Sequence, residues 1–201
     1  MNLPFEVRPF ADEREYARMV DYFLTADDEF LRGMGVARNR LPARDEWIAS
    51  AIRDHHRPVH EKERAYLAWL YDGTLIGHSS LTKIMVGEKA FIHLHIWSPG
   101  YRREGLGTDF FRFSAERFAR ECSLKRLFCE PFADNPSPNR VLPKAGFRFV
   151  KRYRTTPGPI NFEQDVNQYV RDFTGEHALH HTAAGCDRER PLVNAVARPI
   201  E

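Results

Sequence analysis

Cysteine is scarce in this chain of 201 residues, with only Cys122, Cys129 and Cys186. The three lie far apart and form no CxxC pair, so the sequence indicates neither a zinc site nor a disulfide framework. An odd, scattered set of this kind is typical of a reduced cytoplasmic protein. We therefore expect a cytoplasmic location and no structural metal.

Long apolar runs are also missing. No stretch approaches the roughly 20 residues that a membrane-spanning helix needs. The opening segment, MNLPFEVRPF, has neither the basic region nor the apolar region of a secretory signal. These absences predict a protein that neither crosses a membrane nor binds one.

A strong excess of one charge is absent too. The chain carries 30 Lys and Arg against 28 Asp and Glu, a formal net charge of +2. A dedicated nucleic-acid-binding protein usually shows a basic excess or stripe, so we expect no nucleic-acid partner. Hydrophobic residues are 42% and charged residues 29% of the chain, a balance that favours one folded domain of ordinary size.

The spacing of apolar residues predicts both helices and strands before residue 100. Helical spacing runs over residues 13–24 and again after Pro42. An N-terminal strand is expected over 5–10, and three further strands over 65–71, 74–85 and 90–97. Because Asp72 and Gly73 form a strong hairpin turn, these three strands predict an antiparallel meander.

After residue 100 the pattern becomes loop, helix, strand, helix and strands. The expected elements are a helix over 108–122, a strand over 127–131, a helix over 135–145 and strands over 147–155 and 167–173. From residue 174 onward sustained periodicity is lost. We therefore expect one domain over 1–173 and a C-terminal tail over 174–201.

The segment from Tyr101 to Thr108, YRREGLGT, carries the clearest chemistry. Glycine lets backbone N–H groups turn toward one point, and the N-terminus of the following helix adds free N–H groups and partial positive charge. Together they form a cradle suited to a pyrophosphate. The binding residues expected here are Arg102, Arg103, Glu104, Gly105, Leu106, Gly107 and Thr108.

This Arg-x-x-Gly-x-Gly pattern after a meander resembles the acetyl-CoA pyrophosphate loop of the GNAT N-acetyltransferase superfamily. A second block, from Asn135 to Phe147, resembles that superfamily's other signature, an Asn followed eleven residues later by Gly-Phe. The resemblance covers about residues 5–173. It implies an α/β (α+β) GNAT fold with a mixed, mostly antiparallel seven-stranded sheet flanked by about four helices.

The resemblance also implies acetyl-CoA as co-substrate and an amine as acceptor. The pantetheine arm would lie where the fourth strand parts from the fifth, beside the backbone of Ile96, Trp97 and Ser98, while Asn135 and Asn139 would complete the cofactor site. Trp97 is equally well read as a core aromatic. No cysteine lies where the resemblance makes it nucleophilic, so we expect direct attack in a ternary complex.

Two histidines and one glutamate are the candidate catalytic residues. His93 and His95 are two residues apart on a strand, so they share a face, and a histidine with an unperturbed pKa near ~6.5 is a natural general base. Each is as well explained as a hydrogen-bonded structural residue. Glu130 matches a functional Asp of aminoglycoside acetyltransferases, with a capping or salt-bridging role as the alternative. A His-x-His metal site lacks a third ligand.

Related branches of the superfamily share separate features of the chain. Asn139 after Pro138 resembles the ribosomal-protein N-terminal acetyltransferases, and the Thr155–Pro159 stretch resembles aminoglycoside 6′-N-acetyltransferases. Ile-His-Leu around His93 resembles siderophore-biosynthesis acyltransferases, from which Phe132 departs because they carry Asp there. Leu142 stands where many members have a Tyr that protonates the thiolate.

We expect an acetyl-CoA-dependent N-acetyltransferase acting on a primary amine of a small molecule or of a peptide or protein N-terminus. One alternative is acyl transfer to a hydroxylamine in siderophore assembly. Another is a non-catalytic module that binds acyl-CoA. The sequence leaves the oligomeric state open, with a homodimer as one option.

Overall fold

The computed structural model describes residues 5–102 and 105–173. The strands are β1 (Phe5–Pro9), β2 (Arg64–Tyr71), β3 (Thr74–Met85), β4 (Lys89–Ile96), β5 (Arg126–Cys129), β6 (Arg148–Thr155) and β7 (Gln164–Asp172). The α-helices are α1 (Glu13–Leu24), α2 (Asp28–Gly33), α3 (Arg44–His55), α4 (Leu106–Glu121) and α5 (Pro136–Lys144). The predicted tail, 174–201, lies outside the described residues.

The strands form one seven-stranded sheet in the order β1-β2-β3-β4-β5-β7-β6. The pair β4–β5 is parallel and all the other neighbours are antiparallel. The meander and the mixed, mostly antiparallel sheet of a GNAT fold are thereby confirmed. A parallel pair needs a long crossover, and α4 supplies it between β4 and β5.

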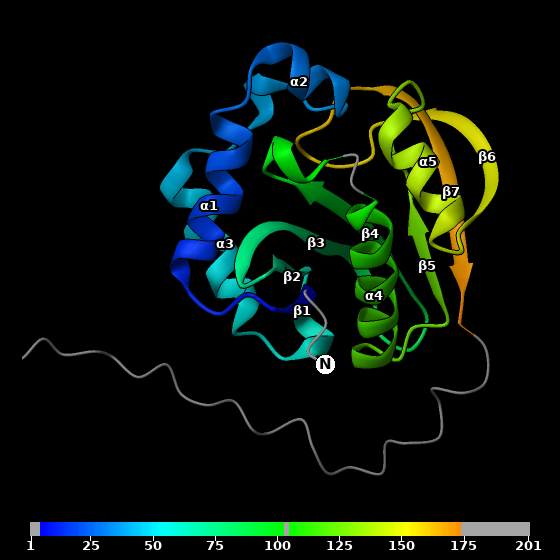
Figure 1. Cartoon of the computed structure of the whole chain (residues 1–201), viewed down its shortest axis with the longest axis horizontal. Helices are drawn as coiled ribbons and strands as arrows, with labels where there is room; N and C mark the ends of the chain where they lie inside the picture. The colour runs from blue at the N-terminus through cyan, green and yellow to red at the C-terminus, as the bar shows by residue number, and fades with distance from the viewer. Residues whose placement is uncertain (1–4, 103–104, 174–201) are drawn as a thin grey trace, which may run out of the picture.

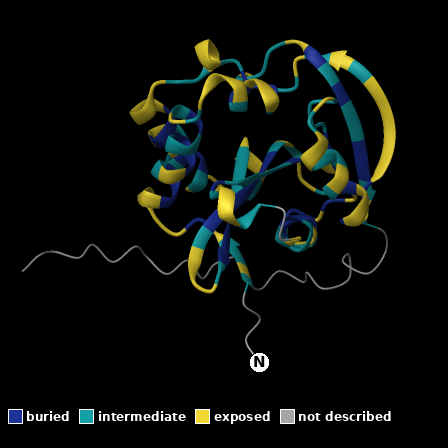
Figure 2. Cartoon of the chain, turned by 45° about the horizontal axis from the view of Figure 1, so that its top comes forward, coloured by how far each residue is buried: buried dark blue, intermediate teal, exposed yellow. Residues whose placement is uncertain are grey.

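Helices cover both faces of the sheet. α1 and α3 lie on one side, and α4 and α5 on the other (Figure 1). β2 shows why, because its buried residues alternate: Leu67 and Trp69 join the core under α4, while Ala68 and Leu70 join the core under α1 and α3. Burial is concentrated in the sheet, whereas β6 is exposed along most of its length (Figure 2).

Local signals set most of the helix bounds. Asp12 caps α1 by accepting a hydrogen bond from the backbone N–H of Glu15 at 3.1 Å. Asn135 caps α5, and Pro136 and Pro138 stand in the first turn, where proline is tolerated. Both helices lie where the sequence predicts them, to within one residue at each end.

The short helix α2 was not predicted. It lies in a stretch that the sequence marks as turn-rich, and Asp27 caps it by accepting from the N–H of Phe30 at 2.7 Å. Six residues make fewer than two turns, too short for an apolar period to show. The fifth helix is therefore an addition to the expected four.

A bulge in β3 positions the end of β4. The register with β2 shifts between Trp69 and Leu70, next to Gly77 on β3. A Cβ on Gly77 would lie 2.3 Å from the carbonyl oxygen of His95, so only glycine admits β4 this closely. The close approach of the two backbones keeps β4 paired with β3 to its last residue, Ile96.

Candidate functional site

Strands β4 and β5 stay paired over only a short length. The last pair is Phe91 with Phe128, although β4 runs on to Ile96. β5 ends at Cys129, and its other edge pairs with β7. The strands therefore separate, and within the described residues no strand pairs with the β5-facing edge of β4 after Phe91.

His93 and Glu130 stand where the strands separate. Side chains alternate across a strand, so each lies on the same face as the phenylalanine two positions before it. The Phe91 and Phe128 rings stack with centroids 5.4 Å apart on that face. The structure thus places His93 of β4 level with Glu130, which directly follows β5. These are two of the three predicted catalytic residues.

His93 is held by its neighbour on β3. Its Nε2 lies 2.9 Å from Oγ1 of Thr82. Burial, and secondarily the charge of Lys83, lowers the pKa of His93 to about 4. The imidazole is therefore neutral near pH 7 and retains a lone pair that can accept a proton.

His95 lies among aromatic rings. Its ring stacks on that of His78 with centroids 4.9 Å apart and contacts Tyr22 and Phe23 of α1 edge-on. Burial is the main cause that lowers the pKa of His95 to about 3. Its surroundings are those of a packed ring, the structural alternative expected from the sequence.

Glu130 is bonded to the two strands beyond β5. Its Oε1 accepts hydrogen bonds from the Tyr153 hydroxyl of β6 and, at 2.7 Å, from Nε2 of Gln168 of β7. Burial and the bond to Glu130 raise the pKa of Tyr153, so its hydroxyl stays a donor. The sequence held no signal for Tyr153 or Gln168, because only the sheet brings them to Glu130.

The glycine turn opens α4 as predicted. Gly105 is the N-cap in a left-handed conformation, φ +79°, and no side chain caps the helix. A Cβ on Gly107 would lie 3.2 Å from Cδ1 of Ile96, so the turn also packs against β4. Leu106 and Thr108 begin the first turn, whose uncapped N–H groups and partial positive charge suit a phosphate.

The arginine before the turn is engaged elsewhere. The Arg102 guanidinium donates to the carbonyl oxygen of Ile96 at 3.0 and 3.2 Å, and lies over the Phe30 ring of α2, 4.6 Å from its centroid. A phosphate contact from Arg102 would have to compete with these bonds. Arg103 and Glu104, for which the sequence predicts the same role, lie outside the described residues.

The residues after β4 divide between core and loop. Trp97 is buried, its backbone N–H donates to the carbonyl of Ile76 at 2.8 Å, and its indole N–H donates to His78. This packing favours the core role for Trp97. Ser98 is half-buried in the loop that follows. Backbone contacts from Ile96, Trp97 and Ser98 to a pantetheine arm stay a prediction.

The two asparagines of the second signature stabilise the surroundings of α5. Asn135 accepts from the N–H of Ser137 at 3.2 Å as the helix cap. Asn139 donates to the carbonyl of Asn135 at 2.6 Å and accepts from Nδ2 of Asn167 at 2.8 Å and from the Tyr169 hydroxyl at 3.1 Å. Their predicted cofactor role is untested, and these bonds show the local role that they have.

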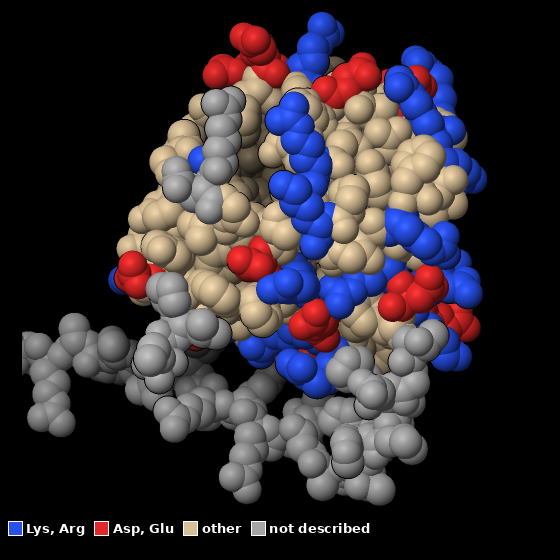
Figure 3. Space-filling view, turned by 45° about the vertical axis from the view of Figure 1, so that its right-hand side comes forward, with Lys and Arg blue, Asp and Glu red and all other residues tan. Residues whose placement is uncertain are grey.

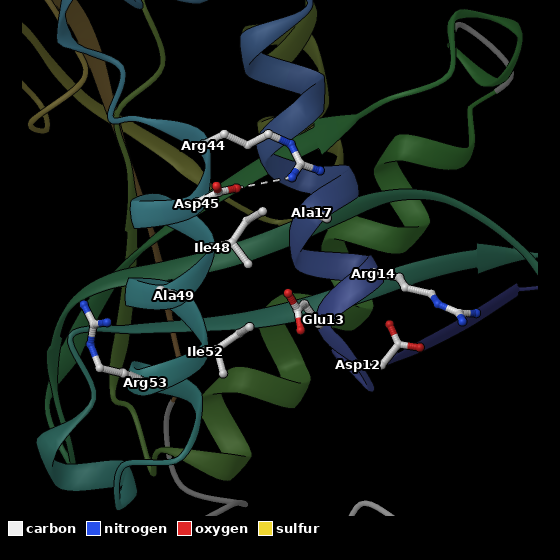
Figure 4. A pocket seen from close by; sticks show the side chains of 10 residues that line it. All are labelled: Asp12, Glu13, Arg14, Ala17, Arg44, Asp45, Ile48, Ala49, Ile52 and Arg53. Carbon is white, nitrogen blue, oxygen red and sulfur yellow. Dashed lines mark ion pairs between the residues drawn. The ribbon is translucent and has the colours of Figure 1, made fainter. Parts of the chain in front are cut away.

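Two surface grooves lie apart from this site. One, of about 970 Å³, runs between α1 and α3, where Ile48 and Ile52 face Ala17 below a charged rim (Figure 4). The other, of about 720 Å³, lies beside α2 and Phe162. Neither groove is lined by His93 or Glu130.

Positive charge gathers on the face of the molecule that carries α4, α5 and β6 (Figure 3). The basic side chains on these three elements are Arg112, Arg117, Arg120, Arg140, Lys144, Arg148, Lys151, Arg152 and Arg154. Part of the charge is neutralised, as between Arg152 and Asp165 at 2.9 Å. Arg112, Arg117, Arg148 and Arg154 are also in ion pairs with acidic side chains, so much of this positive charge is balanced locally.

The described residues show neither a metal-binding cluster nor a membrane-spanning helix. They contain no group of three or more His, Cys, Asp or Glu side chains arranged to hold a metal ion. Nor does any described helix combine the length and apolar character needed to cross a membrane.

The fold defines a class of α/β protein, a mixed seven-stranded sheet in which a glycine turn opens a crossover helix, and the N-terminus of such a helix suits a phosphate. Comparison of the sequence with known families gives the particular one: the acetyltransferase (GNAT) family matches residues 25–147. This is more than half of the chain, which therefore belongs to the GNAT acetyltransferase family. Membership makes acyl transfer its reaction class.

Solved structures agree on the fold. A RimL ribosomal L7/L12 alpha-N-protein acetyltransferase in complex with coenzyme A has a TM-score of 0.68 at 16% identity, over 85% of this chain and 95% of that one. The microcin C7 self-immunity acetyltransferase MccE, with acetyl-CoA and AMP, has 0.67 at 12%, over 86% and 94%. The aminoglycoside acetyltransferase AAC(6')-Ib, with coenzyme A and kanamycin, has 0.63 at 14%, over 84% and 94%. No curated protein sequence matches the chain.

Proposed function

We propose that this protein is an acetyl-CoA-dependent N-acetyltransferase that acetylates a primary amine of a small molecule or of a peptide or protein N-terminus. The observation that carries the proposal is the separation of β4 from β5 directly after Phe91. It leaves the backbone of β4 open beside His93 and Glu130, and the chain from the end of β4 leads to the uncapped N-terminus of α4. Family membership supplies the acyl-transfer chemistry.

The residues present fit acetyl-CoA. The N–H groups at Leu106 and Gly107 would hold its pyrophosphate, and the open edge of β4 would hold the pantetheine arm by backbone hydrogen bonds. When bound, acetyl-CoA supplies an acetyl group activated as a thioester. The structural relatives with coenzyme A or acetyl-CoA in their complexes support this choice.

His93 is the base that we propose for the transfer. The bound ammonium would first lose one proton to neutral His93, directly or through water. The neutral amine would then attack the thioester carbonyl carbon, the carbon–sulfur bond would break, and the amine's second proton would leave to the departing thiolate or to water. Glu130 would bind the incoming ammonium with Oε2, since its two bonds within the described residues both reach Oε1. His95, also predicted as catalytic, would act by holding the neighbouring aromatic packing.

The transfer is direct in this proposal. Cys129 is buried, and burial raises the pKa of its thiol, so it is not available as a thiolate nucleophile. Leu142 is fully buried in the core, so its position offers no acid for the departing thiolate. That proton is left to the amine itself, to water or to another side chain.

The test is acetyl-CoA-dependent thiol release with a panel of aminoglycosides, polyamines, amino acids, short peptides and hydroxylamines. We expect turnover with one class of primary amine. His93→Gln should then lower kcat by roughly 10²–10⁴, the usual worth of general base catalysis, with the Kd of acetyl-CoA unchanged. The matched control is His60→Gln, at an exposed histidine.

Two results would contradict the proposal. Turnover with hydroxylamines alone would favour the siderophore alternative, against which Phe132 counts because it packs on Phe162 at 6.0 Å and offers no carboxylate. Tight acetyl-CoA binding with no turnover on any amine would favour a non-catalytic module. A cytoplasmic location, and a homodimer as one option, stay predictions.

A further inference from the structure

Strand β3 carries a second irregularity, where it pairs with the start of β4. Its register with β4 shifts between Thr82 and Met85. Lys83 and Ile84 of β3 thereby stand opposite the single Ala90 of β4, which makes this place a β-bulge. Ile84 packs against the core under α4, to which Ala90 also belongs. Lys83 is therefore the extra residue of the bulge.

The backbone of Lys83 is strained. It has φ +50°, in the left-handed region that residues other than glycine rarely adopt. Asp72 and Ser123, the other described non-glycine residues with positive φ, are in turns, whereas Lys83 lies inside a strand. Bulges re-aim a side chain, and a strained backbone persists only where its surroundings impose it. The bulge therefore decides on which face of the sheet the Lys83 side chain lies.

That face is the one that carries Phe91 and His93. Side chains alternate along a regular strand, so the residue after Thr82 would otherwise point toward α4. Instead, the Lys83 ammonium lies over the Phe91 ring, 4.7 Å from its centroid. After burial, the charge of Lys83 is the other cause that lowers the pKa of His93. The ammonium is thus close enough to act on the proposed base.

Within the described residues, no acidic side chain balances the charge of Lys83. Its side chain is exposed, and no carboxylate there forms an ion pair with the ammonium. Lys89, two residues before Phe91 on the same face, is exposed as well. Arg126 of β5 also lies on this face, but it pairs with Asp172 at 3.1 Å. Positive charge without a counter-ion therefore adjoins a ring that is itself only half-buried.

The two ends of this face carry opposite charges. Glu130 lies level with His93, where β4 and β5 separate, while Lys83 lies beside Phe91. Neighbouring strands are about 4.8 Å apart and two residues advance a strand by about 6.6 Å, so groups bound at Glu130 and Lys83 would lie roughly 8 Å apart. An extended aminohexyl chain spans a comparable distance.

We propose that Lys83 is a specificity-determining residue that binds an anionic group of the acceptor. The acceptor ammonium would lie at Glu130, and its carboxylate or phosphate at Lys83. The acceptor class is then a primary amine that carries an anionic group. Polycations such as polyamines are disfavoured, because Lys83 and Lys89 repel them. This inference rests on the proposed function and narrows its acceptor.

Four primary amines of the same chain length separate the charges: 6-aminohexanoate, 6-aminohexyl phosphate, 6-aminohexanamide and 1,6-diaminohexane. Thiol release gives kcat and KM for each at saturating acetyl-CoA. Wild type should favour one or both anionic amines over the neutral amide at least fivefold in kcat/KM, and the diamine should be the poorest acceptor. The better of the two anions shows whether the group bound is a carboxylate or a phosphate.

Substitutions at Lys83 test whether this residue is the cause. Lys83→Gln should reduce the preference for the anionic amines to below twofold through a higher KM, with kcat and the Kd of acetyl-CoA within twofold of wild type. Lys83→Arg should keep the preference. Lys144→Gln removes the same charge from α5, on the other side of the sheet, and should leave the preference unchanged (Figure 1). High salt should weaken the preference in wild type, because Lys83 is exposed.

Failure of this inference differs from failure of the proposed function. If the four amines react equally well, or if Lys83→Gln keeps the preference, Lys83 does not bind the acceptor. A weaker Kd of acetyl-CoA in Lys83→Gln would assign Lys83 to the cofactor instead. If none of the four reacts while another amine does, this inference is wrong and the proposed function stands. If acetyl-CoA binds and no amine of any class releases thiol, both are wrong.

Discussion

The indole N–H of Trp97 donates a hydrogen bond to Nδ1 of His78 at 2.8 Å, across two neighbouring strands. An indole N–H is a donor only, so Nδ1 of His78 must be unprotonated and the ring neutral. The ring of His78 stacks on that of His95, and His93 lies two residues before His95 on the same face. His78 is thus kept without charge, and desolvation lowers the pKa of all three histidines on this face.

These histidines should make the protein sensitive to mild acid. In the unfolded chain they take up protons near pH 6.5, whereas His93 and His95 of the folded protein resist down to about 4 and about 3. Between these values the unfolded state binds more protons, so the free energy of unfolding falls as pH falls below about 6.5. Each pKa unit is worth on the order of 1 kcal/mol, so the loss by pH 4.5 should be several kcal/mol.

Urea unfolding between pH 8 and 4.5 measures this slope. His93→Gln should flatten it, while His60→Gln, at an exposed position, should not. NMR of the imidazole nitrogens gives a direct check, since His93 and His95 should show no titration between pH 8 and 5.5. A titration midpoint near 6.5 for either ring would contradict the burial argument.

Gly107→Glu should abolish acetyl-CoA binding. The added Cβ would meet Cδ1 of Ile96 at 3.2 Å, and the carboxylate would compete with a phosphate for the first N–H groups of α4. Negative charge is favourable at a helix N-terminus, so the helix itself should persist. Calorimetry should show at least a hundredfold weaker Kd, with Gly33→Glu as the control of equal charge. An unchanged Kd would show that the turn does not hold the pyrophosphate.

Glu130→Gln separates a role in acceptor binding from a role in the sheet. If Oε2 binds the acceptor ammonium, kcat/KM should fall at least tenfold while the bond from Tyr153 to residue 130 persists. Tyr153→Phe removes that bond and leaves the carboxylate, so it should lower Tm more than kcat/KM. The reverse pattern, with turnover kept in Glu130→Gln, would assign Glu130 to holding β5 against β6 and β7.

Trp69 links the sheet to α4 through one buried bond. Its indole N–H donates to Oγ of Ser114 at 2.9 Å, and its ring stacks on Phe110 with centroids 5.2 Å apart. Trp69→Phe leaves the serine hydroxyl unpaired and a gap in the core, so unfolding should become easier by about 2–4 kcal/mol. In a double-mutant cycle Ser114→Ala should cost less in the Trp69→Phe background. Additive effects would mean that the bond adds no stability.

Features of the fold that depend on a few neighbouring residues could be predicted from the sequence. The bounds of α1 follow from Asp12 and from the apolar period that it precedes, both within a dozen residues. The turn at Gly105 and Gly107 was found for the same reason, because its atoms come from one short segment. The short helix α2 was not predicted, because its six residues are too few to show an apolar period.

Residues that meet through the sheet could not be found in this way. Tyr153 and Gln168 reach Glu130 only because β7 lies between β5 and β6 in the strand order. The partners of Asn139, on β7, follow the same rule. A one-residue change of register would turn these side chains to the other face, and no local pattern reports register between distant strands.

The sequence by itself therefore determined the order of the strands and of the helices other than α2, the glycine turn that opens α4, and the family. These depend on periodicity, caps and glycines that act over a few residues. Only the tertiary structure decided that Glu130 bonds to Tyr153 and Gln168, and that His95 and Trp97 pack among other rings. Such relationships depend on where strands separate and which loops meet, and those distances are set by packing across the whole sheet.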